Sequence, residues 1–275
     1  MAAHKWYDNV APTMDGEIDF EISRLHSVAF AGWDREARAL RSFGLEDGMH
    51  VLEVGSGPGF MTELLGELVP NGRITAVEPF EPLRKYAEAY LADRISTPHR
   101  ILDGTATKLP VESGSCDFAI ARLVFQHLED PVAGATEIMR VLRPGGRALI
   151  LDIDWDLATL SDPMIPRYRT IRERSSAANA AMGSDVYIGR KLWRVLRCAG
   201  FADIEVEILV QHSGGKGIRP FAAQLDPNLA LPLLNLGLIT AEEMQSLREE
   251  VAAFLSAEEP FFLRPLVMVC GQKPR

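Results

Sequence analysis

Between residues 49 and 155, short runs of aliphatic residues alternate with longer segments in which apolar positions recur at helical spacing. The short runs predict strands at residues 50–54, 73–77, 99–102, 117–121 and 147–153. Strands that alternate with helices in this way are typical of successive βαβ units around a parallel sheet. The middle of the chain is therefore expected to form an α/β core.

Two of the intervening helices are marked by their first residues. Pro82 is expected in the first turn of one helix, where its fixed φ is favourable and its missing N–H is not needed. Asp130 is expected to cap another helix, with Pro131 in its first turn. Both helices follow predicted strands, so we expect them to be crossovers between parallel strands.

Two regions lie outside this core. Residues 1–45 show apolar positions at helical spacing, and Asp34 is placed to cap a second short helix, so we expect an N-terminal helical lid. Residues 202–210 and 266–270 predict two more strands, which gives residues 46–275 a doubly wound, mostly parallel sheet of seven strands. The insertion at about 211–260 is expected to form a cap, in which Thr240 and Glu243 make a capping box.

The charge and the apolar runs exclude some partners. The net charge of -9 and the pI near 5.3 leave no broad cationic surface, on which nucleic-acid binding depends for much of its affinity. No apolar run spans a membrane, and acidic residues stand where a signal peptide needs its apolar segment. We expect a cytoplasmic protein that binds neither nucleic acid nor membrane, and the pattern specifies no oligomeric state.

A glycine-rich turn connects the first predicted strand to the following helix. It reads Gly55-Ser56-Gly57-Pro58-Gly59, and Glu53 stands two residues before its first glycine. Glycines allow a tight turn and a close approach of a ligand to the backbone, so the turn alone indicates only a nucleotide or anion site. A carboxylate beside it repels the pyrophosphate of a dinucleotide. It is compatible with S-adenosylmethionine, which carries a sulfonium and an ammonium and has no phosphate.

A second acid, Glu78, stands at the end of the second predicted strand. A carboxylate there can accept hydrogen bonds from both hydroxyls of a ribose, and such charge-assisted bonds are strong and orienting. The register with the glycine turn favours this role over that of a solvated surface acid. Pro79, the next residue, is expected to lie against an adenine ring.

Four segments follow one another within residues 45–155. They are VLEVGSGPG, AVEP, GTATKLPVESGSCDFAIARLVFQHLEDP and MRVLRPGGRALILD. In this order they resemble the class I S-adenosylmethionine-dependent methyltransferases, in particular the branch of quinone-biosynthesis and natural-product enzymes. The resemblance implies a Rossmann-like methyltransferase fold and S-adenosyl-L-methionine as cofactor. It further implies methyl transfer to oxygen, nitrogen or carbon of a small organic acceptor, aromatic or not, in secondary metabolism.

The resemblance also assigns roles to individual residues. Thr105 stands where the family has an acid that holds the adenine amino group, and its hydroxyl can still accept one hydrogen bond. Arg122 is expected beside the methionine part of the cofactor, although a surface salt bridge also explains an arginine there. Tyr7 matches the tyrosine of a lid segment that closes over the cofactor, or else it packs as an apolar residue. The expected cofactor-binding residues are Tyr7, Glu53, Gly55, Ser56, Gly57, Glu78, Pro79, Thr105, Ala106 and Arg122.

His127 is the candidate catalytic residue. It follows the fourth strand, where the resemblance places the acceptor pocket, and an imidazole that titrates near neutral pH can take a proton from a hydroxyl, amine or indole. A histidine that packs the start of the next helix accounts for the same sequence. No metal is expected, because Asp152 and Asp154 lack the further acid that metal-dependent members have after strand four, where this chain has Arg122.

Two other functions are compatible with these residues. An NAD(P)-dependent oxidoreductase shares the strand, turn and helix, but Glu53 and the glycine spacing disfavour it. A protein that binds S-adenosylmethionine without methylating an acceptor shares the whole pattern, because a fold does not dictate a function.

Overall fold

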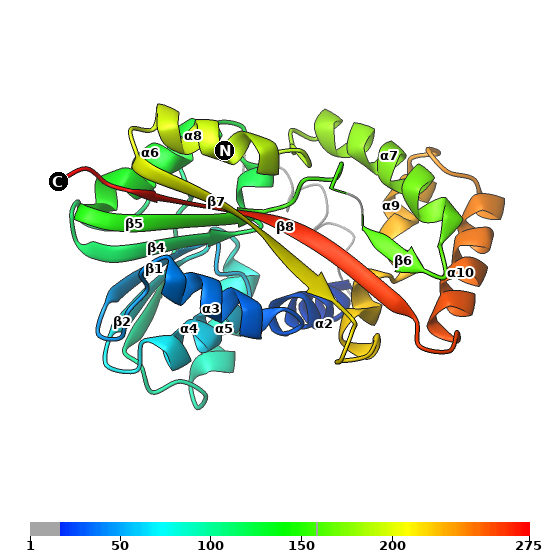
Figure 1. The fold of residues 1–275 in the computed structure, drawn as a ribbon, viewed down its shortest axis with the longest axis horizontal. Coiled ribbons are helices and arrows are strands. Elements are labelled where there is room, and N and C mark those ends of the chain that lie inside the picture. Colours follow the sequence, from blue (N-terminus) through cyan, green and yellow to red (C-terminus); the bar gives the residue numbers. More distant parts are fainter. Residues whose placement is uncertain (1–16, 158) are drawn as a thin grey trace.

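The computed structural model describes residues 17–157 and 159–275. Its centre is one mixed sheet of the strands β1 (His50–Val54), β2 (Arg73–Val77), β3 (His99–Leu102), β4 (Cys116–Arg122), β5 (Leu142–Asp152), β6 (Leu160–Asp162), β7 (Ala202–His212) and β8 (Phe261–Gln272). Five parallel strands in the order β3-β2-β1-β4-β5 continue into the antiparallel strand β8, and β7 pairs with the other edge of β8 (Figure 1). The mostly parallel α/β sheet predicted from the sequence is thereby confirmed.

The described residues contain eight strands, one more than the seven predicted. The additional strand, β6, has three residues and pairs with the beginning of β8, along the same edge that β5 occupies further on. A run of three residues is too short to show a hydrophobic period, so the pattern did not indicate it. Strands β1, β2 and β3 have the predicted bounds, and the other four predicted strands are longer than predicted, although β5 ends one residue earlier, at Asp152.

Side chains of the parallel strands point alternately into two hydrophobic cores, as the pleat of a strand requires. Val51, Phe118 and Leu149 belong to one core, and Leu52 and Ile150 belong to the other. The first core is covered by α2 (Glu17–Phe30), α3 (Trp33–Ser42) and α4 (Phe60–Leu68), and the second by α6 (Pro131–Val141) and α8 (Leu192–Cys198). The sheet is therefore doubly wound.

Both predicted helix starts are confirmed, and one predicted cap is wrong. Helix α5 (Glu81–Leu91) has Pro82 in its first turn, and at the start of α6 the Asp130 side chain accepts a hydrogen bond from a backbone N–H. The N-cap of α3 is Gly32, whereas Asp34 lies inside the first turn and forms an ion pair with Lys216. A negative charge is favourable at that position without a capping bond, because the helix N-terminus is the positive end of the helix dipole.

The predicted insertion between β7 and β8 forms η4 (Arg219–Gln224), η5 (Pro227–Ala230), α9 (Leu231–Asn235) and α10 (Ala241–Leu255). Thr240 and Glu243 form the predicted capping box of α10. These elements pack together with α7 (Pro166–Ala181) around a third core that includes Phe221, Phe254 and Phe262. We refer to α7, η4, η5, α9 and α10 as the helical group.

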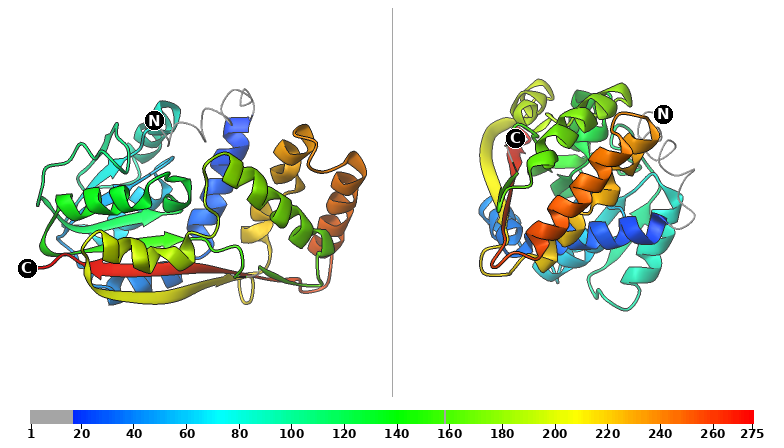
Figure 2. Two further views of the ribbon diagram at one scale, coloured as in Figure 1. Left: turned by 90° about the horizontal axis from the view of Figure 1, so that it is seen from above. Right: turned by 90° about the vertical axis from the view of Figure 1, so that its right-hand side faces the viewer.

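Strand β8 connects the sheet with the helical group. It pairs with β5 over residues 267–272 and with β6 over residues 261–263, so one strand runs from the core to the start of the helical group (Figure 1). Helix α2 stands between the sheet and the helical group (Figure 2) and packs against η4. Within the described residues, none of the helices combines the length and the apolar character that crossing a bilayer requires.

Candidate active site

A cavity of about 360 Å³ lies at the carboxyl ends of β1, β2 and β4, against α2. Nine of the expected site residues line it, namely Glu53, Gly55, Ser56, Gly57, Glu78, Pro79, Ala106, Arg122 and His127. Thr105 does not line it, and its hydroxyl oxygen lies 3.4 Å from that of Thr107. Tyr7 lies outside the described residues. The fold thus brings distant residues together at the edge of the sheet where α/β folds bind ligands.

The glycine turn borders this cavity closely. Gly55 has a φ of 72°, and a Cβ there would lie 2.5 Å from a methyl carbon of Val124, so the position requires glycine. A Cβ on Gly57 would meet no described atom within 4 Å, which shows that this part of the turn faces open space. The buried Ser56 hydroxyl makes no hydrogen bond to any described residue. Because a buried hydroxyl without a partner is costly, we expect a polar group of a ligand to bind it.

Glu78 is only 2% exposed, so it is not a solvated surface acid. One carboxylate oxygen accepts a hydrogen bond from the Gly57 N–H at 2.9 Å, and the other accepts one from the Phe80 N–H at 2.9 Å. Burial raises the pKa of Glu78, while these two donors favour its charged form. The carboxylate holds the glycine turn against the end of β2, and each oxygen retains a lone pair for a ligand.

Glu53 lies on β1 inside the protein. It is 4% exposed, and the Thr62 hydroxyl donates a hydrogen bond to its carboxylate at 2.6 Å. Burial, with a smaller effect from the negative charge of Glu78, raises the pKa of Glu53 to about 8 against the opposing effects of the Thr62 hydrogen bond and the Arg122 charge. In the ligand-free protein Glu53 is therefore mostly protonated at neutral pH, and a cationic ligand nearby would favour its charged form.

Replacing Glu53 with glutamine is expected to change how the stability of the free protein depends on pH. Because its native pKa of about 8 lies above that of an unfolded glutamate, the native state retains a proton that the unfolded state releases, and stability falls as the pH rises through this interval. Glu53→Gln can still accept the bond from Thr62 but has no proton to lose. Thermal unfolding of the wild type and of Glu53→Gln at several pH values measures the difference in their stability.

The variant and the wild type should melt at similar temperatures near pH 5. Above pH 5, the free energy of unfolding of the variant should increase relative to that of the wild type by up to about 1.4 kcal/mol per pH unit, until the pH reaches the native pKa of Glu53. A stability difference that stays constant between pH 5 and pH 8 would show that the carboxyl does not titrate in this range.

Arg122 forms a buried ion pair with Glu36 of α3. Its Nε and one terminal nitrogen donate to the two carboxylate oxygens at 2.8 and 2.9 Å, and the same terminal nitrogen donates to the Val28 carbonyl at 2.9 Å. This bidentate pair fixes α2 and α3 at the end of β4. The sequence allowed a surface salt bridge as the alternative role of Arg122. A salt bridge is present, but it is buried and forms part of the cavity wall.

His127 lies in the turn η2 (Phe125–His127) and lines the cavity. Its Nδ1 is 3.4 Å from the hydroxyl oxygen of Ser184. Burial lowers the pKa of His127 to about 4, and the positive charge of Arg24 lowers it as well. The near-neutral pKa assumed from the sequence does not apply to the free protein, in which the imidazole is neutral at pH 7.

Asp152 and Asp154 are both bound by groups of the protein. Asp152 accepts hydrogen bonds from the backbone N–H groups of Gln126 and Ile153 at 3.1 and 2.8 Å. Asp154 accepts two bonds from the Arg190 guanidinium at 2.6 and 2.5 Å. The charge of Asp154 is thus neutralised by an arginine, and Asp152 is occupied by the backbone of η2.

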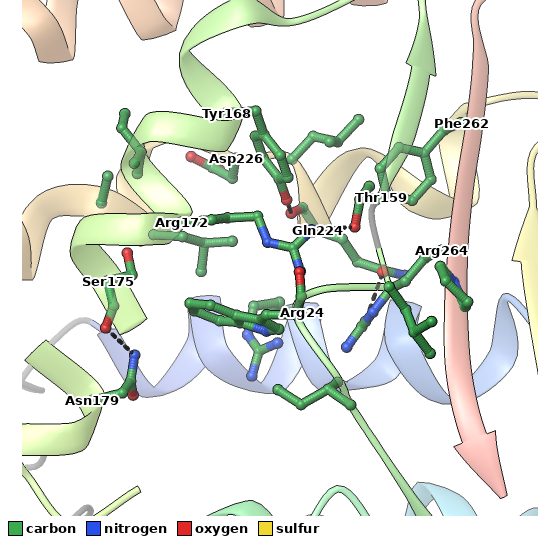
Figure 3. Close-up of a pocket in the computed structure, with 18 of the residues that line it drawn as sticks. Arg24, Thr159, Tyr168, Arg172, Ser175, Asn179, Gln224, Asp226, Phe262 and Arg264 are labelled. Atoms are coloured by element: carbon green, nitrogen blue, oxygen red, sulfur yellow. Dashed lines mark hydrogen bonds between the residues drawn. The ribbon is translucent and has the colours of Figure 1, made fainter. Parts of the chain in front are cut away.

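A second cavity, of about 260 Å³, adjoins the first between α2, β8 and the helical group (Figure 3). Five residues line both cavities, namely Arg24, Ile153, Trp155, Asn179 and Arg264. The sequence analysis did not single out the arginines of this wall. Only Arg264 had a signal in the sequence, as a charged residue inside the apolar run of β8.

Comparisons with known proteins agree with this geometry. Residues 52–150 match the family model described as a methyltransferase domain. Demethylmenaquinone methyltransferase of Lactococcus lactis is 29% identical over 209 residues, which cover 68% of this chain and 78% of that protein. Phosphoethanolamine N-methyltransferase 2 of Haemonchus contortus, solved with S-adenosylhomocysteine, matches with a TM-score of 0.57 and 18% identity over 89% of this chain and 53% of that one. Residues 52–150 therefore form a methyltransferase domain, with the fold of the class I S-adenosylmethionine-dependent methyltransferases.

Another relative of this methyltransferase is a 37.1 kDa protein of transposon TN4556 from Streptomyces fradiae. It is 30% identical over 191 residues, which are 68% of this chain and 54% of that protein. This chain therefore spans about half the length of that relative.

The first cavity fits the cofactor of this class of methyltransferases, S-adenosylmethionine. The Ser56 hydroxyl is buried without a partner among the described residues, and Gly57 faces open space. The acids Glu53 and Glu78 suit a ligand that carries positive charge and ribose hydroxyls. A nicotinamide dinucleotide is not favoured, because its phosphates would lie near the buried Glu78 carboxylate and would not favour ionisation of Glu53.

Proposed function

We propose that this methyltransferase transfers a methyl group to a small organic acceptor held in the second cavity. The observation that carries the proposal is that the same side chains, among them Trp155 and Asn179, border both cavities. A molecule in the second cavity therefore lies next to a cofactor in the first. Helix α2 and the helical group take the parts of the predicted lid and cap, because their side chains enclose the second cavity.

The residues of the first cavity are assigned to the cofactor. Glu78 accepts hydrogen bonds from the ribose hydroxyls, and Pro79 and Ala106 lie against the adenine. Glu53 faces the positively charged part of the ligand, and Arg122 holds the wall beside the methionine part through its pair with Glu36. Thr105 is left out of this set because its side chain lies beside Thr107. Tyr7 stays a prediction for the residues that the structure does not describe.

Catalysis by this site consists mainly of alignment and proton uptake. Bound S-adenosylmethionine supplies a methyl group on a positively charged sulfur. Holding an acceptor against it contributes about 7 to 11 kcal/mol in favourable cases. His127 is proposed to accept the proton that a hydroxyl, amine or indole acceptor loses, because the imidazole lines the cavity and is neutral near pH 7.

The test is incubation of the protein with methyl-labelled S-adenosylmethionine and a panel of phenols, indoles, amines and organic acids. The expected result is an acceptor that gains one labelled methyl group, detected by mass spectrometry. Calorimetry with S-adenosylhomocysteine and with NADH tests the cofactor separately. Tight binding of S-adenosylhomocysteine without turnover of any acceptor would favour the non-methylating alternative.

Methyl transfer is expected to continue in an excess of chelator. Asp154 is neutralised by Arg190, and Asp152 accepts two backbone N–H bonds, so neither acid needs a cation to balance it. Initial rates before and after addition of EDTA measure the effect. Loss of activity that magnesium restores would show that these acids bind a metal during turnover.

A further inference from the structure

Three arginines enter the second cavity from three different elements. Arg24 comes from α2, Arg172 from α7 and Arg264 from β8 (Figure 3). The rest of the wall contains apolar side chains, including Ile171 and Leu247. The cavity therefore joins an apolar surface with a group of cations.

Two of these arginines form no ion pair with an acid among the described residues. Arg172 donates to the Thr159 hydroxyl at 2.7 Å and to the Trp155 carbonyl at 3.3 Å. Arg264 donates to the side-chain oxygen of Gln224 at 2.9 Å. All of these acceptors are neutral, so the two positive charges are hydrogen-bonded but not neutralised.

The two aspartates in the wall do not supply the missing charge. Asp154 is bound by the guanidinium of Arg190 at 2.6 and 2.5 Å. Asp226 caps η5 by accepting a hydrogen bond from the Asn228 N–H at 2.8 Å and forms no ion pair with Arg172 or Arg264, so its single charge does not balance the two arginines. The positive charge of the cavity therefore exceeds the negative charge that faces it.

The titration of Arg264 reflects this imbalance. Burial lowers the pKa of Arg264 to about 10, and the charges of Arg122, Arg24 and Arg172 lower it as well. Burial also lowers the pKa of Arg172. Charged groups behave in this way when they are removed from water without a counter-ion, and such burial is costly unless a ligand compensates for it.

A neutral donor in the same wall also lacks a partner. Gln224 is 6% exposed, and its amide nitrogen makes no hydrogen bond to any described residue. Its amide oxygen is occupied by Arg264, and its backbone carbonyl accepts a bond from the Tyr168 hydroxyl at 3.1 Å. The unsatisfied groups of this cavity are thus an N–H donor and two cations, which together suit the oxygens of an anion.

We propose that the second cavity binds an anionic oxygen group of the methyl acceptor, a carboxylate or a phosphate, with Arg172 and Arg264 as its counter-ions and Gln224 as a neutral donor. That the bound molecule is the acceptor rests on the proposed function. The apolar part of the wall then holds the body of the molecule, and Trp155 and Asn179 lie between the anionic group and the first cavity. The substrate class is small organic acids or phosphate esters.

Binding measurements with matched probes test this proposal. The protein, saturated with S-adenosylhomocysteine, is titrated with 4-hydroxybenzoate, with phenyl phosphate and with the uncharged 4-hydroxybenzamide. At least one of the two anions should bind about tenfold or more tightly than the amide, a difference of about 1.4 kcal/mol, and the tighter anion identifies the group. Equal affinities for the anions and the amide would overturn the proposal.

Substitutions locate the site. Arg172→Gln and Arg264→Met should each weaken binding of the preferred anion by about tenfold or more and leave binding of the amide unchanged. Arg169→Gln is the matched control, because Arg169 also lies on α7 but its side chain is 90% exposed and pairs with Glu173. Anion binding that survives both substitutions would place the anion elsewhere and contradict the proposal.

Thermal unfolding gives a second readout. Arg264→Met is expected to fold and, without ligand, to melt at a higher temperature than the wild type, because it removes a buried charge that has no counter-ion. The preferred anion should raise the melting temperature of the wild type and not that of the variant. Equal stabilisation of both proteins by the anion would overturn the role of Arg264.

These measurements do not depend on turnover. Anion binding through Arg172 and Arg264 without methylation of any acceptor would retain this site and refute the proposed function. Methylation of acidic acceptors at rates that neither substitution changes would retain the proposed function and refute this site.

Discussion

His127→Ala is expected to lower the rate of methyl transfer in a single turnover by about 10² to 10⁴-fold, the range for loss of a general base. The imidazole lines the first cavity, and its pKa of about 4 keeps it unprotonated at pH 7. Because so low a pKa also makes it a weaker base than an ordinary histidine, the loss is expected toward the lower end of this range. Affinity for S-adenosylhomocysteine should change little, because His127 lies near Arg24, which lines both cavities, and is assigned to the acceptor and not to the cofactor. Rapid-quench measurements with labelled cofactor give the rate, and calorimetry gives the affinity.

The pH dependence follows from the lowered pKa. An unperturbed histidine loses its basic form below about pH 6.5, whereas burial and the charge of Arg24 hold the pKa of His127 near 4 in the free protein. Between pH 5.5 and pH 8, kcat/KM should therefore show no limb that belongs to His127. A limb near pH 6.5 that is present in the wild type and missing in the variant would contradict this pKa.

Glutamine at this position separates proton uptake from packing. His127→Gln keeps a polar side chain near Ser184 but takes up no proton at these pH values. If His127 acts as a base, the glutamine variant should be about as slow as the alanine variant. Recovery of the rate by glutamine, together with a lowered melting temperature of the alanine variant, would assign His127 to packing η2.

Those parts of the fold that follow from local patterns were predictable from the sequence. The central strands of the parallel core, such as β1, are buried on both faces and read as short aliphatic runs. Proline, aspartate and threonine mark the starts of α5, α6 and α10. Helix α7 also begins with a proline, Pro166, but its sequence is mostly polar and only Ala178 in it is buried, so no apolar face at helical spacing indicated it. Its position depends on packing against α10, which a local pattern does not encode.

The site likewise contains residues that local sequence patterns predict and residues that they do not. Gly55, Ser56, Gly57 and Glu78 directly follow strands that are neighbours in the sheet, so their convergence follows from the topology. The pairing of Arg122 with Glu36 joins residues that are 86 positions apart, and no local spacing indicates it. The arginines of the second cavity come from α2, α7 and β8, and they meet only because the helical group packs onto α2. Burial then determines the pKa values of Glu53 and His127, which residue type alone leaves at their ordinary values.

Glu78→Ala is expected to weaken binding of S-adenosylhomocysteine by about tenfold or more. Each hydrogen bond from a ribose hydroxyl to a charged carboxylate contributes on the order of 1.5 to 3 kcal/mol, and about 1.4 kcal/mol corresponds to a factor of ten in Kd. The substitution also leaves the Gly57 and Phe80 N–H groups without their acceptor, which loosens the glycine turn. Calorimetric titration of the folded variant measures the loss.

Two further variants show whether the effect belongs to the site. Glu81→Ala removes an exposed acid only three residues away, which pairs with Lys85, and should leave the affinity unchanged. Glu78→Gln keeps one oxygen acceptor but replaces the other with a donor, so its affinity should lie between those of the wild type and Glu78→Ala. If all three variants bind S-adenosylhomocysteine as the wild type does, Glu78 does not contact the ribose, and its two backbone bonds serve only to hold the turn. If Glu78→Ala weakens binding but Glu78→Gln binds S-adenosylhomocysteine as tightly as the wild type, the negative charge of Glu78 is not needed for binding. The lost affinity of Glu78→Ala would then come from the loosened glycine turn.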